Sequence, residues 1–239
     1  MFLNAALTAA LDSIAERAAD VRRAFTPGAS PQHDDVATPS AKSDFTLDPL
    51  AVAAPDGAYF MVRDARGEYR YTRDGDFEIR DGRLTDRSGA AVCGERAPGD
   101  DVTDLRVDAV DAALGRVLAA RVEPDGTVIY QREAVDPRTG LRESQRVVAG
   151  RILLARFPSA TRLESDGDLL RPPAGVEAQR GVPGGATFGT LLPMHRERSR
   201  INIDEGLVRL KEAYMRFEAL AAAENAKGHL GKTAMDLLK

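Results

Sequence analysis

The middle of the chain consists of short segments of alternating apolar and polar residues that Asp-Gly pairs separate from one another. Asp-Gly favours a tight reversal, because glycine adopts a positive φ and the aspartate side chain bonds nearby backbone. Helical patterns do not alternate with these segments, which argues against a doubly wound parallel sheet. We therefore expect an antiparallel β-domain over residues 57–200. The five pairs are Asp56-Gly57, Asp74-Gly75, Asp81-Gly82, Asp125-Gly126 and Asp166-Gly167.

The segments between these turns have the composition or the period of two that strands require. The clearest case is residues 68–73, in which large and polar residues alternate. The expected strands are residues 58–63, 68–73, 76–80, 83–85, 90–93, 116–122, 127–131 and 147–157.

Residues 1–26 have the pattern of an amphipathic helix, with apolar residues recurring on one face. Thr26-Pro27-Gly28 ends the pattern, because proline cannot continue a helix. Residues 27–56 are rich in Pro, Ser, Asp and Ala and keep no period of 2 or 3.6, which predicts an extended linker. The apolar face of the helix contains Leu3, Leu7, Ala10, Ile14, Val21 and Phe25.

A second helix is predicted over residues 201–239, beginning near Asn202. Its apolar residues are spaced alternately by four and three, as in a heptad seam. Asp204 and Glu205 lie in the first turn, where the helix dipole favours anions. We expect Gly228 and Gly231 to break this helix. The seam is Ile203, Leu207, Leu210, Tyr214, Phe217, Ala221 and Glu224.

The expected fold is therefore mainly β with helical termini. Both terminal helices have long apolar faces that a short isolated helix leaves exposed, so they are expected to meet each other or other subunits. The residues predicted to form this polymer interface are Leu7, Ile14, Leu207, Leu210, Tyr214 and Phe217.

Composition excludes several classes of function. The formal net charge is −4, whereas a nucleic-acid-binding domain normally has a basic excess. The sequence contains no run near the ~18 apolar residues of a membrane span. Trp is absent, which argues against a stacking platform for sugars or bases. The single Cys93 cannot form an internal disulfide. The first 25 residues lack the pattern of a cleaved signal peptide, because acidic residues interrupt any apolar core.

Candidate chemistry is weak. Residues 226–233 fit a loose phosphate-loop pattern ending in Gly-Lys-Thr, but a helix precedes them instead of a strand, so we expect no nucleotide there. Asp74-Gly-Asp76 and Asp166-Gly-Asp168 lack the order of an EF-hand loop and are interpreted as turns. The histidines His33, His195 and His229 lie in separate segments without metal spacing. No residue is assigned a catalytic, cofactor or metal role, although a carboxylate pair for glycoside hydrolysis stays open.

Several motifs together resemble the flagellar rod and hook axial proteins. Tyr71-Thr-Arg-Asp-Gly-Asp-Phe77, then Asp81-Gly-Arg-Leu84 and residues 88–94, resemble the family's "YTRDGxF…DGxLVxxxGxxVxG". Residues 50–62 resemble "LDxAIxGxGFFxV", and residues 150–157 resemble "GxIxLAxF". Residues 188–205, including Glu197, resemble "LGTLxxGxLExSNVNxxxE". The order holds over roughly residues 50–220, and the lack of an Asn-rich N-terminal motif indicates a divergent member.

The resemblance implies a structural subunit of the bacterial flagellar basal-body rod, without enzymatic activity and without cofactors. Such subunits polymerise into a helical axial drive shaft that crosses the periplasm. The terminal helices would pair in a coiled-coil-like inner layer. Export would use the flagellar type III apparatus without a cleaved signal peptide. The partners would be further copies and other axial proteins, with no nucleic acid or small-molecule substrate. The alternative is a non-flagellar exported β-domain, such as a cell-envelope enzyme or a carbohydrate-binding module.

Overall fold

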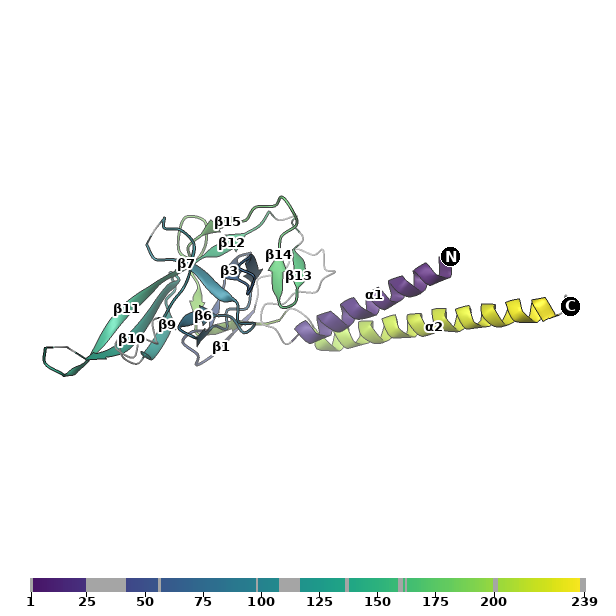
Figure 1. The fold of residues 1–239 in the computed structure, drawn as a ribbon, viewed down its shortest axis with the longest axis horizontal. Coiled ribbons are helices and arrows are strands. Elements are labelled where there is room, and N and C mark those ends of the chain that lie inside the picture. The colour runs from purple at the N-terminus through teal and green to yellow at the C-terminus, as the bar shows by residue number, and fades with distance from the viewer. Residues whose placement is uncertain are drawn as a thin grey trace. The chain divides into compact units, whose positions relative to one another are not determined.

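The chain forms two units, which Figure 1 shows in a computed structural model. The structure describes residues 2–24, 42–55, 57–97, 99–107, 117–135, 138–158, 161, 163–199 and 202–236. One unit, the helical unit, comprises residues 1–25, 29–36 and 199–239. The other, the β-domain, comprises residues 26–28 and 37–198 and contains every strand of the described residues.

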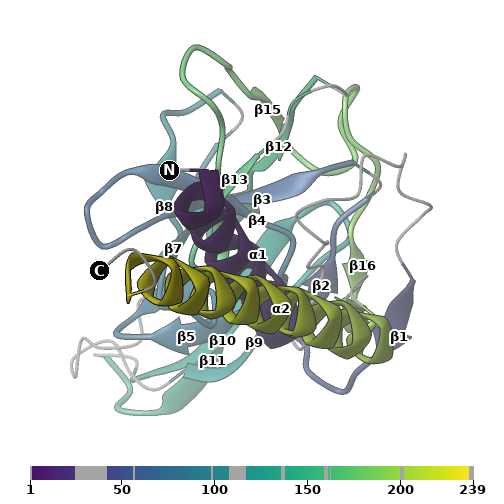
Figure 2. The same ribbon diagram turned by 90° about the vertical axis from the view of Figure 1, so that its right-hand side faces the viewer.

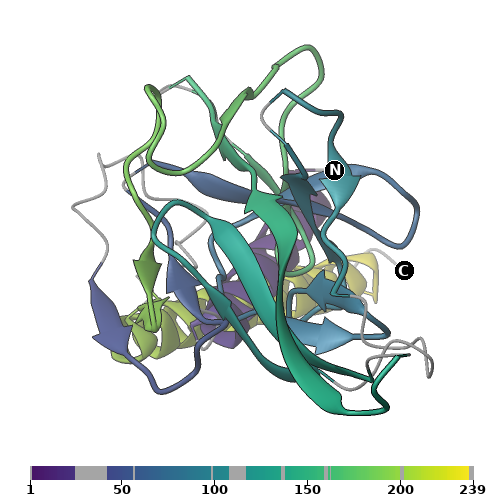
Figure 3. The ribbon, with the colours of Figure 1, turned by 90° about the vertical axis from the view of Figure 1, so that its left-hand side faces the viewer.

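All strand pairs of the β-domain that the structure describes are antiparallel. The main sheet follows the order β13-β14-β4-β3-β7-β11-β10-β9, and β1–β17 and β2–β16 form two small ribbons. Figure 3 looks onto the long hairpin of β10 and β11. The strands are β1 (Ser43–Phe45), β2 (Val52–Ala53), β3 (Tyr59–Arg63), β4 (Tyr69–Thr72), β5 (Glu78–Arg80), β6 (Arg83–Thr85), β7 (Ala91–Glu95), β8 (Thr103–Asp104), β9 (Val117–Val122), β10 (Thr127–Val135), β11 (Arg142–Ile152), β12 (Leu154–Arg156), β13 (Glu164–Asp166), β14 (Leu169–Arg171), β15 (Gln179–Gly181), β16 (Leu192–Pro193) and β17 (His195–Glu197).

Side chains of the main sheet are buried on both of its faces. In β3, Phe60 and Val62 belong to the larger core, whereas Met61 between them belongs to a second, smaller cluster. This division follows from the strand period of two, which sends successive side chains to opposite faces. The second cluster also contains Tyr71 of β4 and Cys93 of β7, so β3, β4 and β7 are interior strands.

The Asp-Gly pairs do not all form tight turns. Asp81 and Gly82 both have positive φ values, 50° and 70°, and join β5 to β6 in the two-residue hairpin that the sequence predicts. Gly75 instead allows close packing. A Cβ on Gly75 would lie 1.9 Å from the carbonyl oxygen of Val52, and the Val52 N–H donates to the Gly75 carbonyl over 2.9 Å. Interpreting Asp74-Gly75 as a tight turn was therefore wrong.

The predicted linker needs a correction at its end. Residues 42–55, which were expected to be extended and without regular structure, contribute β1 and β2 to the β-domain. Val52 and Ala53 are buried in β2, which pairs with β16. Two strands of two or three residues are too short to show a period, and their partners lie more than a hundred residues away, so local pattern could not reveal them. The rest of the predicted linker, residues 27–41, lies outside the described residues.

The helical unit contains α1 (Phe2–Arg23) and α2 (Ile203–Asp236). The Asn202 side-chain oxygen accepts from the Asp204 N–H over 3.1 Å, so α2 begins with a cap where the sequence predicts. The expected break at Gly228 and Gly231 was wrong, because α2 continues to Asp236. A single glycine costs a helix only about 1 kcal/mol, which the flanking helix formers tolerate. A mainly β chain with helical termini is confirmed.

Candidate subunit interface

The two helices of the helical unit lie against each other near the end of α1 and the start of α2 (Figures 1 and 2). A Cβ added to Gly206 would lie 3.2 Å from Cγ2 of Val21, so the helices approach closely at this point. The partly buried residues of α2 recur at alternating spacings of three and four. The residues with this spacing are Ile203, Gly206, Leu210, Ala213, Phe217, Leu220 and Glu224, and Arg209 and Ala221 beside them are also partly buried.

Four of the six predicted interface residues lie on partly buried helix faces. Leu210 and Phe217 belong to the partly buried face of α2. Leu7 and Ile14 are partly buried on α1. These four residues lie where two paired helices would bury them. Their role in a polymer stays a prediction, and so does a coiled-coil geometry.

The other two predicted residues, Leu207 and Tyr214, lie on an exposed face of α2, with 49% and 54% of their surfaces accessible. Val208 and Met215 flank them, at 55% and 59%. Positions seven residues apart share one side of a helix, so these four residues form one apolar stripe, here called the exposed stripe. Contiguous exposed apolar surface on a soluble chain marks a site for interaction with another protein.

The strand that leads into α2 is held by three ion pairs in succession, here called the β17 clasp. Arg196 pairs with Asp76 over 2.7 Å. Glu197 pairs with Arg73 over 2.8 Å. Arg198, the residue after β17, pairs with Asp44 over 2.6 Å. Arg73 and Asp76 lie in the loop between β4 and β5, and Asp44 lies in β1, so the clasp ties the last strand of the domain to two other segments.

The centre of the clasp is the buried pair of Arg73 and Glu197, whose side chains are only 5% and 1% exposed. Arg73 Nε lies 2.9 Å from Glu197 Oε1, and Arg73 Nη2 lies 2.8 Å from Oε2, which is a bidentate contact. Arg73 also donates to the carbonyl of Ala58 over 2.9 Å. The sequence placed Arg73 and Glu197 in two separate family-like motifs, and the structure brings the two motifs together.

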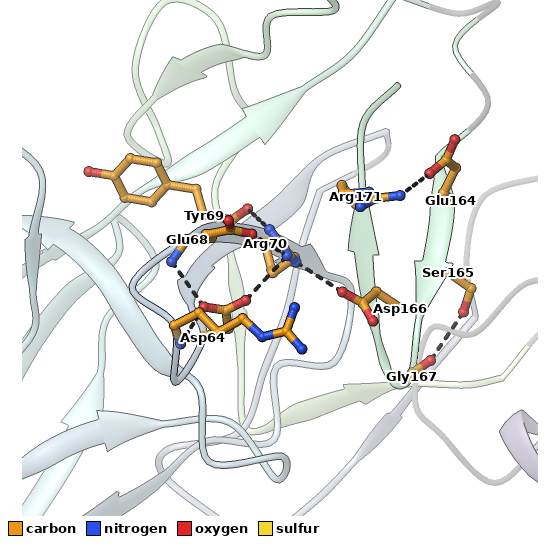
Figure 4. A network of polar contacts seen from close by, with 10 residues as sticks. Asp64, Glu68, Tyr69, Arg70, Glu164, Ser165, Asp166, Gly167 and Arg171 are labelled. Atoms are coloured by element: carbon orange, nitrogen blue, oxygen red, sulfur yellow. Dashed lines mark hydrogen bonds and ion pairs between the residues drawn. The ribbon is translucent and has the colours of Figure 1, made fainter. Parts of the chain in front are cut away.

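A second arginine, Arg70 on β4, joins the hairpin of β13 and β14 to the main sheet (Figure 4). It donates to Glu68 over 2.6 Å and lies within 3.4 Å of carboxylate oxygens of Asp64 and Asp166. The hydrogen bond to Glu68 is the main cause that raises the pKa of Arg70. Asp166 is the last residue of β13, so this network holds the β13–β14 hairpin against β4.

The weak chemical motifs have structural roles. Residues 226–233 lie inside the continuous helix α2, so the turn that a phosphate loop needs is not formed. The Asp76 carboxylate forms ion pairs with Arg87 and Arg196. Among the described residues, no group of three or more His, Cys, Asp or Glu could hold a metal ion. His195 contacts the Phe45 ring, whereas His33 and the side chain of His229 lie outside the described residues. Burial raises the pKa of the Cys93 thiol to about 12, which makes it a poor nucleophile.

The sequence missed the clasp as a unit. Arg73 and Glu197 belong to two separate motifs of the sequence, and a pair 124 residues apart leaves no local signal. In the part of the chain that the structure describes, neither helix combines the length and the apolar composition that crossing a membrane takes.

One family model matches the chain. Residues 56–130 match the model of the flagellar hook protein FlgE/F/G D1 domain. A search of curated proteins found no match. The matched residues include β3 to β7 and the Arg73 half of the clasp.

The described strands form an antiparallel β-domain with a helix at either end of the chain, which is not a doubly wound architecture. Residues 56–130 are similar to the D1 domain of the flagellar hook and rod proteins, which supports a place for the chain in that family. The match supports an axial structural protein of the flagellum.

Proposed function

We propose that the chain is a subunit of the bacterial flagellar basal-body rod, which polymerises into the axial drive shaft and transmits torque. The D1-domain match supports an axial protein of the rod and hook kind. Its partners are further copies and other axial proteins. It reaches the periplasm through the flagellar type III export apparatus without a cleaved signal.

The single observation that carries assembly is the exposed stripe. Leu207 and Tyr214 are apolar, about half exposed and repeated on one side of a long helix. Burying one such side chain is worth roughly 1.5–3 kcal/mol. Each subunit in a polymer repeats the contact, so individually modest contributions add to a stable shaft. We infer that the partly buried face holds α1 and α2 together, while the exposed stripe meets neighbouring subunits.

The experiment is a charge placed on the exposed stripe. Leu207→Asp adds a negative charge where a neighbour is expected, and a buried unpaired charge costs several kcal/mol. Cells carrying Leu207→Asp should lose motility while the soluble protein persists with its β-domain melting transition unchanged. The matched control is Arg216→Ala, which changes the net charge by the same amount at an exposed position on another side of α2. Normal motility of Leu207→Asp cells would exclude this role of the stripe.

A further inference from the structure

The loop between β4 and β5 buries two neighbouring carboxylates, Asp74 and Asp76, which are 6% and 8% exposed. Asp76 is the partner of both nearby cations: Arg87 bonds one of its oxygens, and Arg196 Nη2 lies 2.8 Å from Oδ1 and 2.7 Å from Oδ2. Asp74 accepts the backbone N–H of Asp76 over 3.0 Å. No arginine or lysine of the described chain forms an ion pair with Asp74.

Further negative groups surround Asp74. Asp86, in the turn between β6 and β7, is 3% exposed and accepts from Ser88 Oγ over 2.7 Å and from the Ala90 N–H over 2.9 Å. Asp168, in the turn between β13 and β14, adds another negative charge. Asp74 is therefore acted on by two guanidinium groups and by further carboxylates of its own loop and of two others. Like charges in a buried site disfavour ionisation of the group that lacks a cation of its own.

The pKa directions agree with this count of charges. Burial raises the pKa of Asp74 to about 7, with Asp86 and Asp168 raising it further and Arg87 and Arg196 opposing. Burial also raises the pKa of Asp86, against the hydrogen bonds that it accepts. Nε of Arg196 is buried and has no hydrogen-bond partner among the described residues, so the guanidinium that holds β17 is only partly satisfied.

We propose that the charge state of Asp74 controls how firmly the clasp holds β17. A neutral Asp74 leaves Asp76 as the sole anionic partner of Arg196. An ionised Asp74 places a second buried negative charge beside Asp76 and competes for the same cations. Opening of β17 admits water and relieves that charge. The device lies within the β-domain, so it operates in the single chain and does not depend on the polymer.

The direction of the pH effect follows from linkage. The pKa of Asp74 is raised in the closed clasp and returns toward its ordinary value of 3.8 when water enters. The closed state is therefore most stable below about pH 4, loses stability as pH rises toward about 7, and levels off above that value. Raising the pH should loosen β17 within this window.

The test is hydrogen exchange of the full chain, measured by mass spectrometry between pH 4 and pH 8. Peptides that cover residues 42–47 and 194–199 report the clasp, because the Thr46 N–H donates to Met194 and the Arg198 N–H donates to Lys42. After division by the intrinsic exchange rate, protection should fall by about tenfold or more between pH 5 and pH 7.5. Asp74→Asn keeps an oxygen for the Asp76 N–H and should remove most of this dependence.

Two further variants make the outcome decisive. Asp86→Asn removes a neighbouring charge and should move the midpoint of the transition to lower pH. Asp44→Asn breaks the exposed end of the clasp and should reduce protection without changing its pH dependence. The proposal is overturned if Asp74→Asn keeps the wild-type pH dependence, if Asp86→Asn leaves the midpoint in place, or if Asp44→Asn abolishes the dependence.

Discussion

Arg73 and Glu197 form a bidentate ion pair inside the β-domain, although 124 residues separate them in sequence. The pair joins the loop after β4 to the last strand before α2. Water reaches neither side chain to a useful extent, so each charge depends on the other for its solvation. The family-like motifs around these two residues are thus two halves of one contact.

Removing one partner of this pair should destabilise the β-domain strongly. Arg73→Met leaves the Glu197 carboxylate buried without its partner, and such a change costs about 3–5 kcal/mol. The double variant Arg73→Met/Glu197→Leu should recover most of that loss, since an apolar pair can replace a buried ion pair. Urea denaturation followed by near-ultraviolet circular dichroism measures this, because four of the five tyrosines lie in the β-domain. Additive losses in the double variant would show that the two side chains do not interact.

Gly75 should be intolerant of any side chain. A Cβ there would lie 1.9 Å from the Val52 carbonyl oxygen, so Gly75→Ala forces backbone apart and should cost about 3 kcal/mol of unfolding free energy. The control is Gly67→Ala, because a Cβ at Gly67 meets nothing within 4 Å. Only the positive φ of Gly67 opposes this change, and it should lower the unfolding free energy by about 1 kcal/mol. Equal losses for the two variants in thermal melts would contradict the close contact between β2 and this loop.

The Cys93 thiol should be inert in the folded chain. Its pKa is raised to about 12 by burial, so at pH 8 the reactive thiolate is rarer by about a thousandfold than for a cysteine of pKa 9. A disulfide reagent at pH 8 should label the folded chain far more slowly than the chain in concentrated urea. Labelling at similar rates in both conditions would mean that the strand β7 is open to solvent.

Disrupting the partly buried face of α2 should leave the stability of the β-domain unchanged. Leu210→Asp places a charge on the face that α1 covers, so the helices should part while the β-domain keeps its own core. Helical circular dichroism should fall, and the near-ultraviolet transition of the β-domain should move by less than about 0.5 kcal/mol. A loss of both signals together would mean that the two units fold as one.

The parts of the fold that sequence predicted are those with a local signal. The helices follow from spacing and capping, as at Asn202, and the hairpin of β5 and β6 follows from Asp81-Gly82. Strands β1, β2, β16 and β17 have two or three residues each, and only distant pairing makes them strands. Their existence depends on tertiary contacts that no window of sequence displays.

The sequence pattern predicted only part of the partly buried face of α2. A heptad assigned by apolar residues alone grouped Leu207 and Tyr214 with Leu210 and Phe217. In the structure, Gly206 and Ala213 take the partly buried positions at which the heptad had placed Leu207 and Tyr214, because the helices approach closely there. This choice leaves the larger side chains on the exposed stripe.

The central claim, that this chain is a rod subunit, is tested most directly on isolated hook–basal bodies. Mass spectrometry of basal bodies from wild-type cells should find the chain in the rod fraction, and deletion of its gene should abolish motility and leave basal bodies without a complete rod. Deletion cells that swim normally, or complete rods that lack this chain, would contradict the account.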